Sequence, residues 1–518
     1  MEILQLPHYG WWSILPPLVA IILALITKEV LSSLIVGILA GALIYSHGHP
    51  VSMIVTTFTI MSEKMGSNAN ILIFLGLLGA LVVLVTRAGG SAAYGEWAIR
   101  RIKTRKGASL ATAALGCIIF IDDYFNCLTV GTVMRPVTDR HRISRAKLAY
   151  LLDATAAPIC IIAPISSWGA SVATYMQDAN AGNGMTVFVQ TIPYNLYAFG
   201  TIFMILIICS THFNFGSMAK FEKNAIEKGD LFSNEEFAEE AKVQQNFRKR
   251  GRVYDLIIPI LSLIIFTVLA MVYTGGGFTG EASFTESFGN CDSALSLVLG
   301  SFCALVVTFF LFIPRKVITF TEFFTGITEG IKSMVPAFSI LILAWTIGGI
   351  CGSDYLNTGG FVGNLVNDSS FPVFVLPAVI FLVAGFLGFA TGTSWGTMAL
   401  LIPIGAAICT PANTAHLLLP VFGAIMAGAV YGDHVSPISD TTIMSSTGAG
   451  CNHIDHVSSQ MFYATLVTVC AAIGYLIMGL LNSPWIPLAI TLVLIMVSIL
   501  YFGKASQKKH PIQYNDIH

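Results

Sequence analysis

Six ionisable residues lie inside segments that are otherwise apolar, and their chemistry needs an explanation. They are Asp122, Asp123, Asp153, Asp433, His434 and Asp440. A charge at the centre of a bilayer costs about 2.5–3.5 kcal/mol on insertion scales, so each is a candidate for function. The adjacent carboxylates Asp122 and Asp123 also repel each other, which favours a bound cation or a retained proton.

Hydroxyl and amide side chains accompany these acids where helices are expected to break. Pro158, Pro164 and Pro437 each remove a backbone donor and so free a carbonyl. Carbonyls, hydroxyls and carboxylates are hard oxygen ligands that suit a small cation. We expect ion or substrate binding by the acids and His434, with Asp123, Asp153 and Asp440 as metal ligands. The further candidates are Asn126, Thr155, Ser166, Ser167, Thr393, Ser394, Thr397, Ser436, Ser439 and Thr441.

Each candidate has a structural alternative. Asp433 and His434 could simply be paired with each other or with the backbone, which for a lone buried histidine is the more common case. The serines and threonines could serve close helix packing, which membrane helices favour. Trp168 and Trp395 each follow a serine, and we expect them to wedge the motifs apart rather than to touch a substrate.

The polar motifs occur twice, about 270 residues apart. Ala163–Trp168 resembles Ser436–Thr441 at an offset of 273. The polar break Asp122–Asn126 likewise corresponds to Thr391–Thr397. Duplicated, helix-breaking polar motifs within apolar segments are typical of secondary transporters.

The composition predicts a membrane protein that would hold these motifs. Of the 518 residues, 55% are hydrophobic and 11% are charged, whereas soluble domains carry about 25% charged residues. The mean hydropathy is +0.76. We therefore expect an all-α polytopic membrane protein with about eleven transmembrane helices and two re-entrant hairpins. The ten cysteines include no C-x-x-C pair, and we expect no disulfide framework and no cleaved signal segment.

The distribution of Lys and Arg orients the chain. Basic residues gather in 100–106, 135–147, 220–252 and 504–509, whereas 275–292 holds acids and no Lys or Arg. By the positive-inside rule, the basic segments are cytoplasmic. Because the basic residues are divided among short loops, we expect no nucleic-acid partner. The N-terminus is expected outside and the C-terminus in the cytoplasm.

Following the charges along the chain predicts two repeats of opposite orientation. The first repeat covers 1–212 and includes a hairpin at 107–134. The second covers 254–481 and includes a hairpin at 372–410. A cytoplasmic linker, 213–253, joins them, and 482–518 forms an extra helix with a cytoplasmic tail.

The absence of Lys and Arg from the middle of the spans bears on the substrate. A site rich in Asp and poor in Arg favours a cation or a proton over an anion. Carboxylates that bind either a proton or a metal ion, but not both together, would give exchange without further machinery. We expect no cofactor, with Na+ and H+ as the transported or coupling ions.

The motifs resemble those of the NhaC-type sodium/proton antiporters of the ion-transporter superfamily, over about residues 10–500. The resemblance is carried by Phe120–Asn126, Thr155–Pro158, Pro164–Gly169, Gly392–Thr397 and Gly432–Thr442, with no departure within them. It implies a carrier of the bacterial inner membrane that exchanges Na+ for H+. It also implies an elevator-type fold with scaffold and transport domains, embedded in lipid as a homodimer.

Other readings stay open at this point. A Na+- or H+-coupled carrier of a small organic solute, such as an amino acid or hydroxy acid, would fit two opposed hairpin tips. An intramembrane enzyme would use Ser394 with His434 or the Gly432-Asp433 pair, but it would not explain the duplication. A passive channel would differ by showing no saturation and no counterflow.

Overall fold

The computed structural model describes residues 9–509, except 28–29, 165, 180, 212, 233–250, 279–286, 288–290, 353, 359–360, 362–371, 410–413, 438 and 482. Every regular element in this described part is a helix. The all-helical, polytopic class expected from composition is therefore confirmed.

The first half runs from η1 to α12. Its helices are η1 (Gly10–Ile14), α1 (Leu15–Thr27), α2 (Val30–Tyr45), α3 (Pro50–Ser67), α4 (Ala69–Ala88), α5 (Gly90–Arg101), α6 (Arg105–Ile118), α7 (Asp123–Arg140), α8 (Arg145–Cys160), α9 (Ser167–Asp178), α10 (Gly184–Thr191), η2 (Ile192–Tyr194), α11 (Leu196–Ser210) and α12 (Met218–Lys228).

The second half runs from α14 to α25. Its helices are α14 (Tyr254–Thr274), α16 (Ser293–Phe312), α17 (Phe320–Ser333), α18 (Val335–Cys351), η3 (Val373–Val375), α20 (Leu376–Thr391), α21 (Ser394–Ile408), η4 (Ala415–Leu417), α22 (Leu418–Val435), α23 (Asp440–Ala449), α24 (His453–Leu481) and α25 (Trp485–Lys509).

Fewer helices are long enough to span a bilayer than the eleven expected. Among the described residues, six helices are sufficiently long and apolar, or eight if each of two bent pairs is one span. The difference arises because the polar motifs divide several expected spans into shorter helices. The apolar segment that begins in α8, for example, continues into α9 only after a break.

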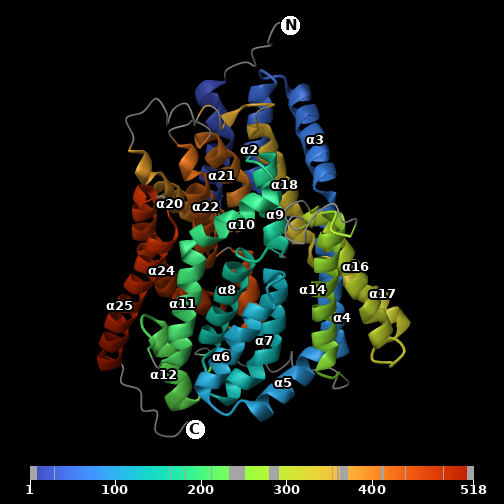
Figure 1. Ribbon diagram of the computed structural model, residues 1–518, viewed down its shortest axis with the longest axis vertical. Helices are drawn as coiled ribbons and strands as arrows, with labels where there is room; N and C mark the ends of the chain where they lie inside the picture. The colour runs from blue at the N-terminus through green and yellow to red at the C-terminus, as the bar shows by residue number, and fades with distance from the viewer. Residues whose placement is uncertain are drawn as a thin grey trace.

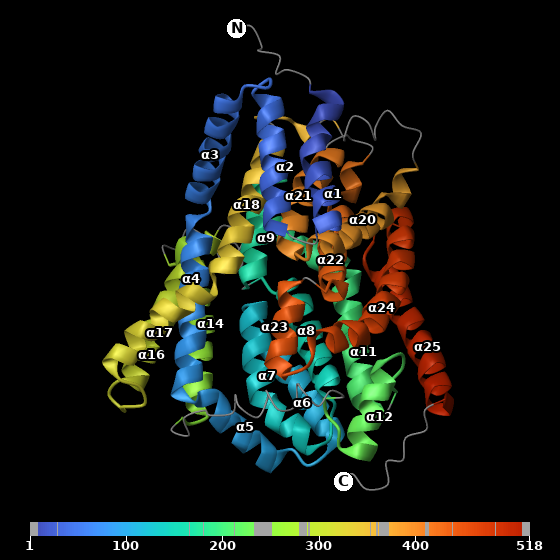
Figure 2. The same cartoon turned by 180° about the vertical axis from the view of Figure 1, so that it is seen from behind.

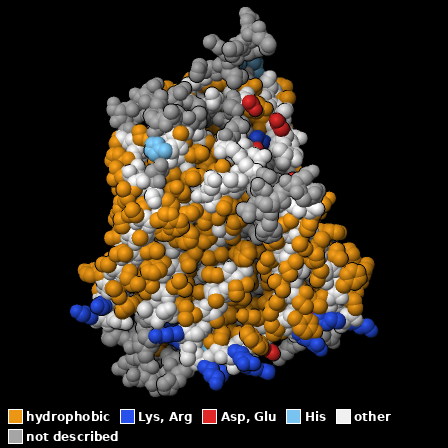
Figure 3. Space-filling view, in the orientation of Figure 1, with side chains coloured by type: hydrophobic (Ala, Val, Ile, Leu, Met, Phe, Trp, Pro, Cys, Tyr) orange, Lys and Arg blue, Asp and Glu red, His pale blue; other side chains and the backbone are white. Residues whose placement is uncertain are grey.

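Apolar side chains cover much of one face of the molecule (Figure 3). Figure 3 shows hydrophobic side chains over most of the visible face, with Lys and Arg at one end and acidic side chains near the other. Large apolar side chains are exposed on the surface; Phe310 is 66% exposed and Val493 61%. An apolar exterior of this extent is what a hydrocarbon environment requires.

A helix break lies within or beside each of the four polar motifs, although Asp123–Asn126 already belong to α7. Residues 119–122 separate α6 from α7, and Gly392-Thr393 separate α20 from α21, where Gly392 has a left-handed φ of +65°. Breaks at 161–166 and 436–439 separate α8 from α9 and α22 from α23. The repeat boundaries and the re-entrant course of the two hairpins stay predictions.

The two broken helices run past each other at the middle of the molecule. In Figure 2, α8 and α23 lie in the same half, while α9 and α22 lie in the other. The helix α23 packs along α7 and α8, and α9 packs against α21. Figure 1 shows α24 and α25 on one side of this centre and α4, α14, α16 and α17 on the opposite side.

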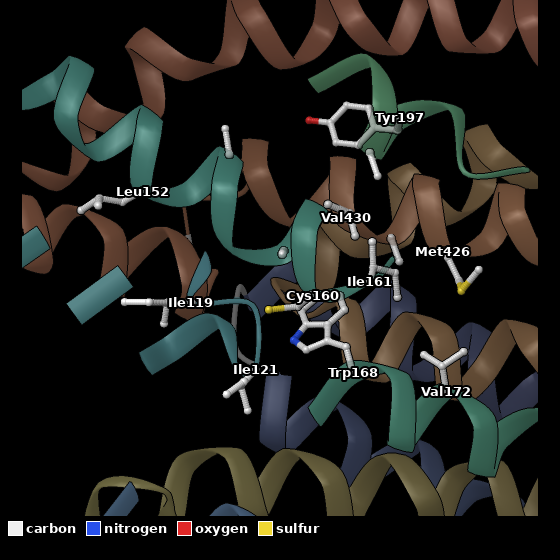
Figure 4. Close-up of a cluster of buried hydrophobic side chains, with 14 of the residues drawn as sticks. Ile119, Ile121, Leu152, Cys160, Ile161, Trp168, Val172, Tyr197, Met426 and Val430 are labelled. Carbon is white, nitrogen blue, oxygen red and sulfur yellow. The ribbon is translucent and has the colours of Figure 1, made fainter. Parts of the chain in front are cut away.

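Apolar side chains fill the space around the breaks. Figure 4 shows the Trp168 ring beside Cys160 and Ile161, with Ile121 on the adjacent break and Val430 nearby. These side chains are at most 1% exposed. The polar motifs are therefore enclosed in a packed core, where an unsatisfied polar group is costly.

Candidate functional site

The first break brings two acids and a serine together. Asp122 precedes α7 and accepts a hydrogen bond from the Ser167 hydroxyl at 2.9 Å, and the Ser167 N–H donates to Ile121 O at 2.8 Å. Asp123 begins α7, where a carboxylate complements the helix dipole. Both carboxylates are fully buried. The α6–α7 break is thus tied directly to the start of α9.

Asn126 and Thr155 stabilise this break. The Asn126 amide donates toward Gly116 O at 2.7 Å, Ile119 O at 2.8 Å and Thr155 O at 3.0 Å. The Thr155 hydroxyl donates to Leu151 O in its own helix at 2.7 Å. The Asn126 amide thus satisfies carbonyls near the break, whereas the Thr155 hydroxyl bonds within its own helix.

The second break is organised around Asp433. Its two carboxylate oxygens accept hydrogen bonds from the Ser439 hydroxyl at 2.7 Å and from the Thr441 hydroxyl at 2.6 Å. The Thr442 hydroxyl also donates to Asp433 O at 3.1 Å. Asp433 therefore joins the end of α22 to the start of α23, with the buried Ser436 between them.

Three of the predicted hydroxyls cap the helices that follow the breaks. Ser166 caps α9, Thr393 caps α21 and Ser439 caps α23, each by accepting a backbone N–H three residues later. These helix starts direct partial positive charge toward the centre. The Ser394 hydroxyl donates to Ala429 O of α22 at 3.1 Å, whereas the Thr397 hydroxyl donates to Thr393 O within α21.

Asp153 lies in the middle of α8 and contacts α24. Its Oδ2 accepts a hydrogen bond from the Gln460 amide. The same amide donates to His434 O at 2.6 Å. His456 Nε2 lies 3.4 Å from Asp153 Oδ2 and 2.9 Å from the Ser445 hydroxyl. All of these side chains are at most 1% exposed.

His434 is paired with a neighbouring side chain, but the neighbour is Tyr197 rather than Asp433 or the backbone. Its Nδ1 lies 2.9 Å from the Tyr197 hydroxyl of α11, and the two rings are 5.7 Å apart. The pair fixes the orientation of the imidazole next to Asp433 and to the Gln460 amide.

Four of the predicted carboxylates lie in the surroundings of one buried side chain. The Cys127 thiol in α7 is fully buried. It interacts electrostatically with four carboxylates, those of Asp153, Asp123, Asp122 and Asp433. The acids come from α7, α8, α22 and the 119–122 break, so elements from both halves supply them. The sequence places no Lys or Arg in 107–134, 148–219 or 333–503.

The expected metal set of Asp123, Asp153 and Asp440 stays a prediction. Asp440 begins α23, but its side chain lies outside the described residues. Among the side chains that are described, no group of three or more His, Cys, Asp and Glu is arranged to hold a metal. A sodium site here would therefore use carbonyl, hydroxyl or amide oxygens beside a carboxylate.

Two residues at this centre were absent from the sequence-based set. His456 and Gln460 lie one helical turn apart in α24, which is otherwise largely apolar. The spacing i, i+4 places them on one face, and this pattern could have identified them. The predominantly apolar composition of the segment indicates a plain span and does not by itself point to a site.

Side chains and close helix packing close the molecule at the end of α23 that faces α7. Arg135 donates to Thr447 O at 3.0 Å and Arg145 to Ala449 O, so both arginines bind carbonyls at the end of α23. Gly131 and Gly448 bring α7 and α23 into backbone contact, because a Cβ on Gly131 would lie 2.5 Å from the Gly448 carbonyl carbon. No solute could pass between these helices as they stand.

The other end contains a cavity of about 130 Å³. It lies between α3, α9, α18 and α21, and it is lined by Tyr175, Trp345, Ala399 and Pro403. Lys64 and Asp178 form an ion pair of 3.6 Å at this cavity. The centre is therefore closed toward the arginines and less tightly packed toward Lys64.

An ion-pair cluster ties α12 to the helices of the core. Glu222 is fully buried and pairs with Arg105 and with Lys147, the latter at 3.3 Å. It also accepts the Ser144 N–H at 2.9 Å. Burial raises the pKa of the Glu222 carboxyl, but the attraction of the two cations outweighs this effect. The pKa of Glu222 is lowered from 4.5 to about 2.

Comparisons with known proteins agree on the family. The model of the Na+/H+ antiporter family matches residues 159–480. A protein of Haemophilus influenzae, described as uncharacterized, is 42% identical over 505 residues, which cover 94% of each chain.

Other relatives match shorter stretches. The malate-2H(+)/Na(+)-lactate antiporter of Bacillus subtilis is 30% identical over 205 residues, 35% of this chain and 42% of that protein. NhaC, an Na(+)/H(+) antiporter of the same organism, is 32% identical over 150 residues, 28% of this chain and 31% of its own. The solved structure of Neisseria gonorrhoeae MtrF aligns with 95% of this chain and 96% of its own at a TM-score of 0.48 and 12% identity.

Proposed function

Since the chain belongs to the Na+/H+ antiporter family, we propose that it exchanges Na+ for H+ across a membrane. The family confirms the resemblance inferred from the motifs, and with it a secondary transporter rather than an enzyme. The Ser394–His434 reading is accordingly set aside. Ser394 instead donates to Ala429 O, and His434 pairs with Tyr197.

The observation that supports this exchange most strongly is the convergence of Asp122, Asp123, Asp153 and Asp433 around Cys127. Buried carboxylates need a positive charge nearby, and a proton or a small cation can supply it. If the same oxygens accept either one, loading a cation displaces a proton. The carrier then exchanges the two ions if it changes its conformation only when the carboxylates hold a proton or a cation.

Alternating access would come from the two halves. We propose that they are inverted repeats and that the breaks form one shared site at mid-depth. The end with Arg135 and Arg145 faces the cytoplasm, which places the cavity near Lys64 outside. An elevator-type movement, a homodimer and the bacterial inner membrane belong to the same proposal.

Purified protein in proteoliposomes tests this function. A sodium pulse applied outside vesicles that contain a pH-sensitive dye should drive protons across the membrane in the opposite direction. Lithium should substitute in part, and choline should have no effect. A dye signal that is identical with sodium and with choline, between pH 7 and 9, would reject the substrate assignment.

A sodium- or proton-coupled carrier of a small organic solute is the second candidate. The cavity beside α9 and α21 favours it, because Lys64 and the acids Glu63, Asp178 and Asp354 line it together with Trp345. Such a lining offers both signs of charge to a zwitterion or a hydroxy acid. One relative is named as an antiporter of malate with lactate. Counterflow with labelled amino acids and hydroxy acids separates the two candidates.

A further inference from the structure

Gln460 connects three helices through one amide group. Its Nε2 donates to Asp153 Oδ2 in α8 and to His434 O at the end of α22, while the side chain comes from α24. Both partners are acceptors, so the orientation of the amide is fixed with its NH2 group toward them. Its carbonyl oxygen, Oε1, must then point elsewhere.

Two buried oxygens remain open at this junction. Within the described residues, Asp153 Oδ1 and Gln460 Oε1 have no hydrogen-bond partner. Both side chains are 0% exposed. Asp153 Oδ1 belongs to the carboxylate, and Gln460 Oε1 to the amide, that are hydrogen-bonded to each other. Both open oxygens therefore lie close to this hydrogen bond.

The open oxygens distinguish Asp153 from Asp433. Each oxygen of Asp433 accepts a hydrogen bond from a hydroxyl, whereas Asp153 uses only Oδ2. A buried carboxylate with an open oxygen attracts a positive charge far more strongly than one that hydroxyls already satisfy.

We propose that Asp153 and Gln460 form a site for a small monovalent cation, with Oδ1 and Oε1 as two of its ligands. This rests on the proposed exchange function, but it assigns the site to α8 and α24 rather than to the duplicated motifs. A carboxylate oxygen beside an amide oxygen is a hard donor pair that suits a sodium-sized ion. The site is small because packed side chains surround it.

Cation binding at this position would also couple the two halves. The ion would pull α8 toward α24, and Gln460 would carry that change to the end of α22 through His434 O. Binding of the cation would thus change the positions of α8 and α22, the helices that lead into the breaks at 161–166 and 436–439.

Gln460→Met tests the site, because methionine keeps the length of the side chain and removes the hard oxygen. With purified protein in detergent, sodium chloride should raise the Tm of the wild type above its value in choline chloride at equal ionic strength. In the variant we expect this rise to disappear at the same salt concentration. In proteoliposomes, the half-saturating sodium concentration should increase at least about tenfold, the effect of losing one ligand.

Thr468→Val is the matched control on the same helix. Thr468 is 5% exposed, and its hydroxyl bonds only to Ala464 O within α24, so this variant should keep the sodium response. If Gln460→Met does not fold, Gln460→Glu retains an oxygen at the position, and its half-saturating sodium concentration should not rise.

The outcomes separate the site from the exchange activity. A wild-type sodium effect on Tm that Gln460→Met abolishes supports the site, even if no proton exchange is measured. A folded Gln460→Met variant with an unchanged sodium effect and unchanged half-saturation overturns it. In that case sodium-driven exchange by the wild type would leave the proposed function intact.

Discussion

The indole rings of Trp168 and Trp395 lie 5.2 Å apart, with their planes inclined by 52°. Trp168 is in the first turn of α9 and Trp395 in the first turn of α21, and each follows a serine. The contact therefore joins the starts of two helices that come from different halves of the chain. It places the predicted wedge residues against each other at the centre, beside the buried acids.

Removing one of these rings should destabilise the protein. Trp395→Ala would leave a cavity in a packed core, at a cost of about 3–5 kcal/mol, whereas Trp395→Phe keeps an aromatic contact and should cost less. Thermal unfolding in detergent measures the difference. The control is Trp485→Ala in α25, where the ring is 66% exposed; an equal loss of Tm at both positions would argue against the contact.

Asp153→Asn should reduce exchange by at least about a hundredfold. The substitution removes the charge that a buried cation needs, and unpairing a buried charge costs about 3–5 kcal/mol. Sodium-driven proton movement in proteoliposomes gives the rate. Glu329→Gln, whose carboxylate pairs with Arg87 on the exposed side of α17, should leave the rate within about twofold. Full activity in Asp153→Asn would remove this carboxylate from the site.

The positions of the helix breaks could be predicted from the sequence because their causes are local. Prolines, glycines and capping hydroxyls act on the backbone within a few residues, and each of the four breaks lies within or beside the motif that predicts it. The acids at the breaks were identified for a similar reason, since a buried charge is conspicuous in an apolar segment.

The partners of those acids were harder to predict. Asp153 depends on Gln460, which is 307 residues away in sequence, and no local pattern links the two. Among the described residues, fewer than eleven helices are individually long enough to span a bilayer, because polar motifs divide several apolar segments in a way that composition alone does not show. The contacts of the Asn126 and Thr155 side chains with helix carbonyls also join positions that no local pattern links; their role as ligands stays a prediction.

The close contact between α7 and α23 should be lost when a single methyl group is added at Gly448. A Cβ on Gly448 would meet the carbonyl oxygen of Cys127, so Gly448→Ala should prevent close packing and open this end. The buried Cys127 thiol should then react with a small thiol reagent faster than in the wild type, by about tenfold or more.

Gly66→Ala provides the comparison for that experiment, since a Cβ at Gly66 meets no atom within 4 Å. Its labelling rate should equal that of the wild type. Mass spectrometry of the labelled peptide identifies Cys127 among the ten cysteines. Unchanged labelling in Gly448→Ala would show that the glycine contact is not a barrier.

The Glu222 cluster should make stability depend on acid pH. The pKa of Glu222 is lowered from 4.5 to about 2, so its contribution is complete above about pH 4.5 and is lost as the pH falls toward 2. The contribution at pH 7 is about 3 kcal/mol, since a tenfold change in proton affinity corresponds to about 1.4 kcal/mol.

Glu222→Gln should therefore lower the Tm at pH 7 and flatten the loss of Tm between pH 4.5 and pH 3. Lys223→Gln, which affects only a surface pair with Glu227, should keep the wild-type profile. Parallel profiles for Glu222→Gln and the wild type would mean that other carboxylates dominate acid unfolding.

Competition between sodium and protons for the same buried carboxylates can be measured directly. The half-saturating sodium concentration of the purified carrier in proteoliposomes would be determined at several pH values between 7 and 9. If the two ions share the oxygens near Asp153, this concentration should rise as the pH falls, by up to about tenfold for each pH unit where one proton competes with one sodium ion. A half-saturating concentration that is the same at every pH would contradict a shared site.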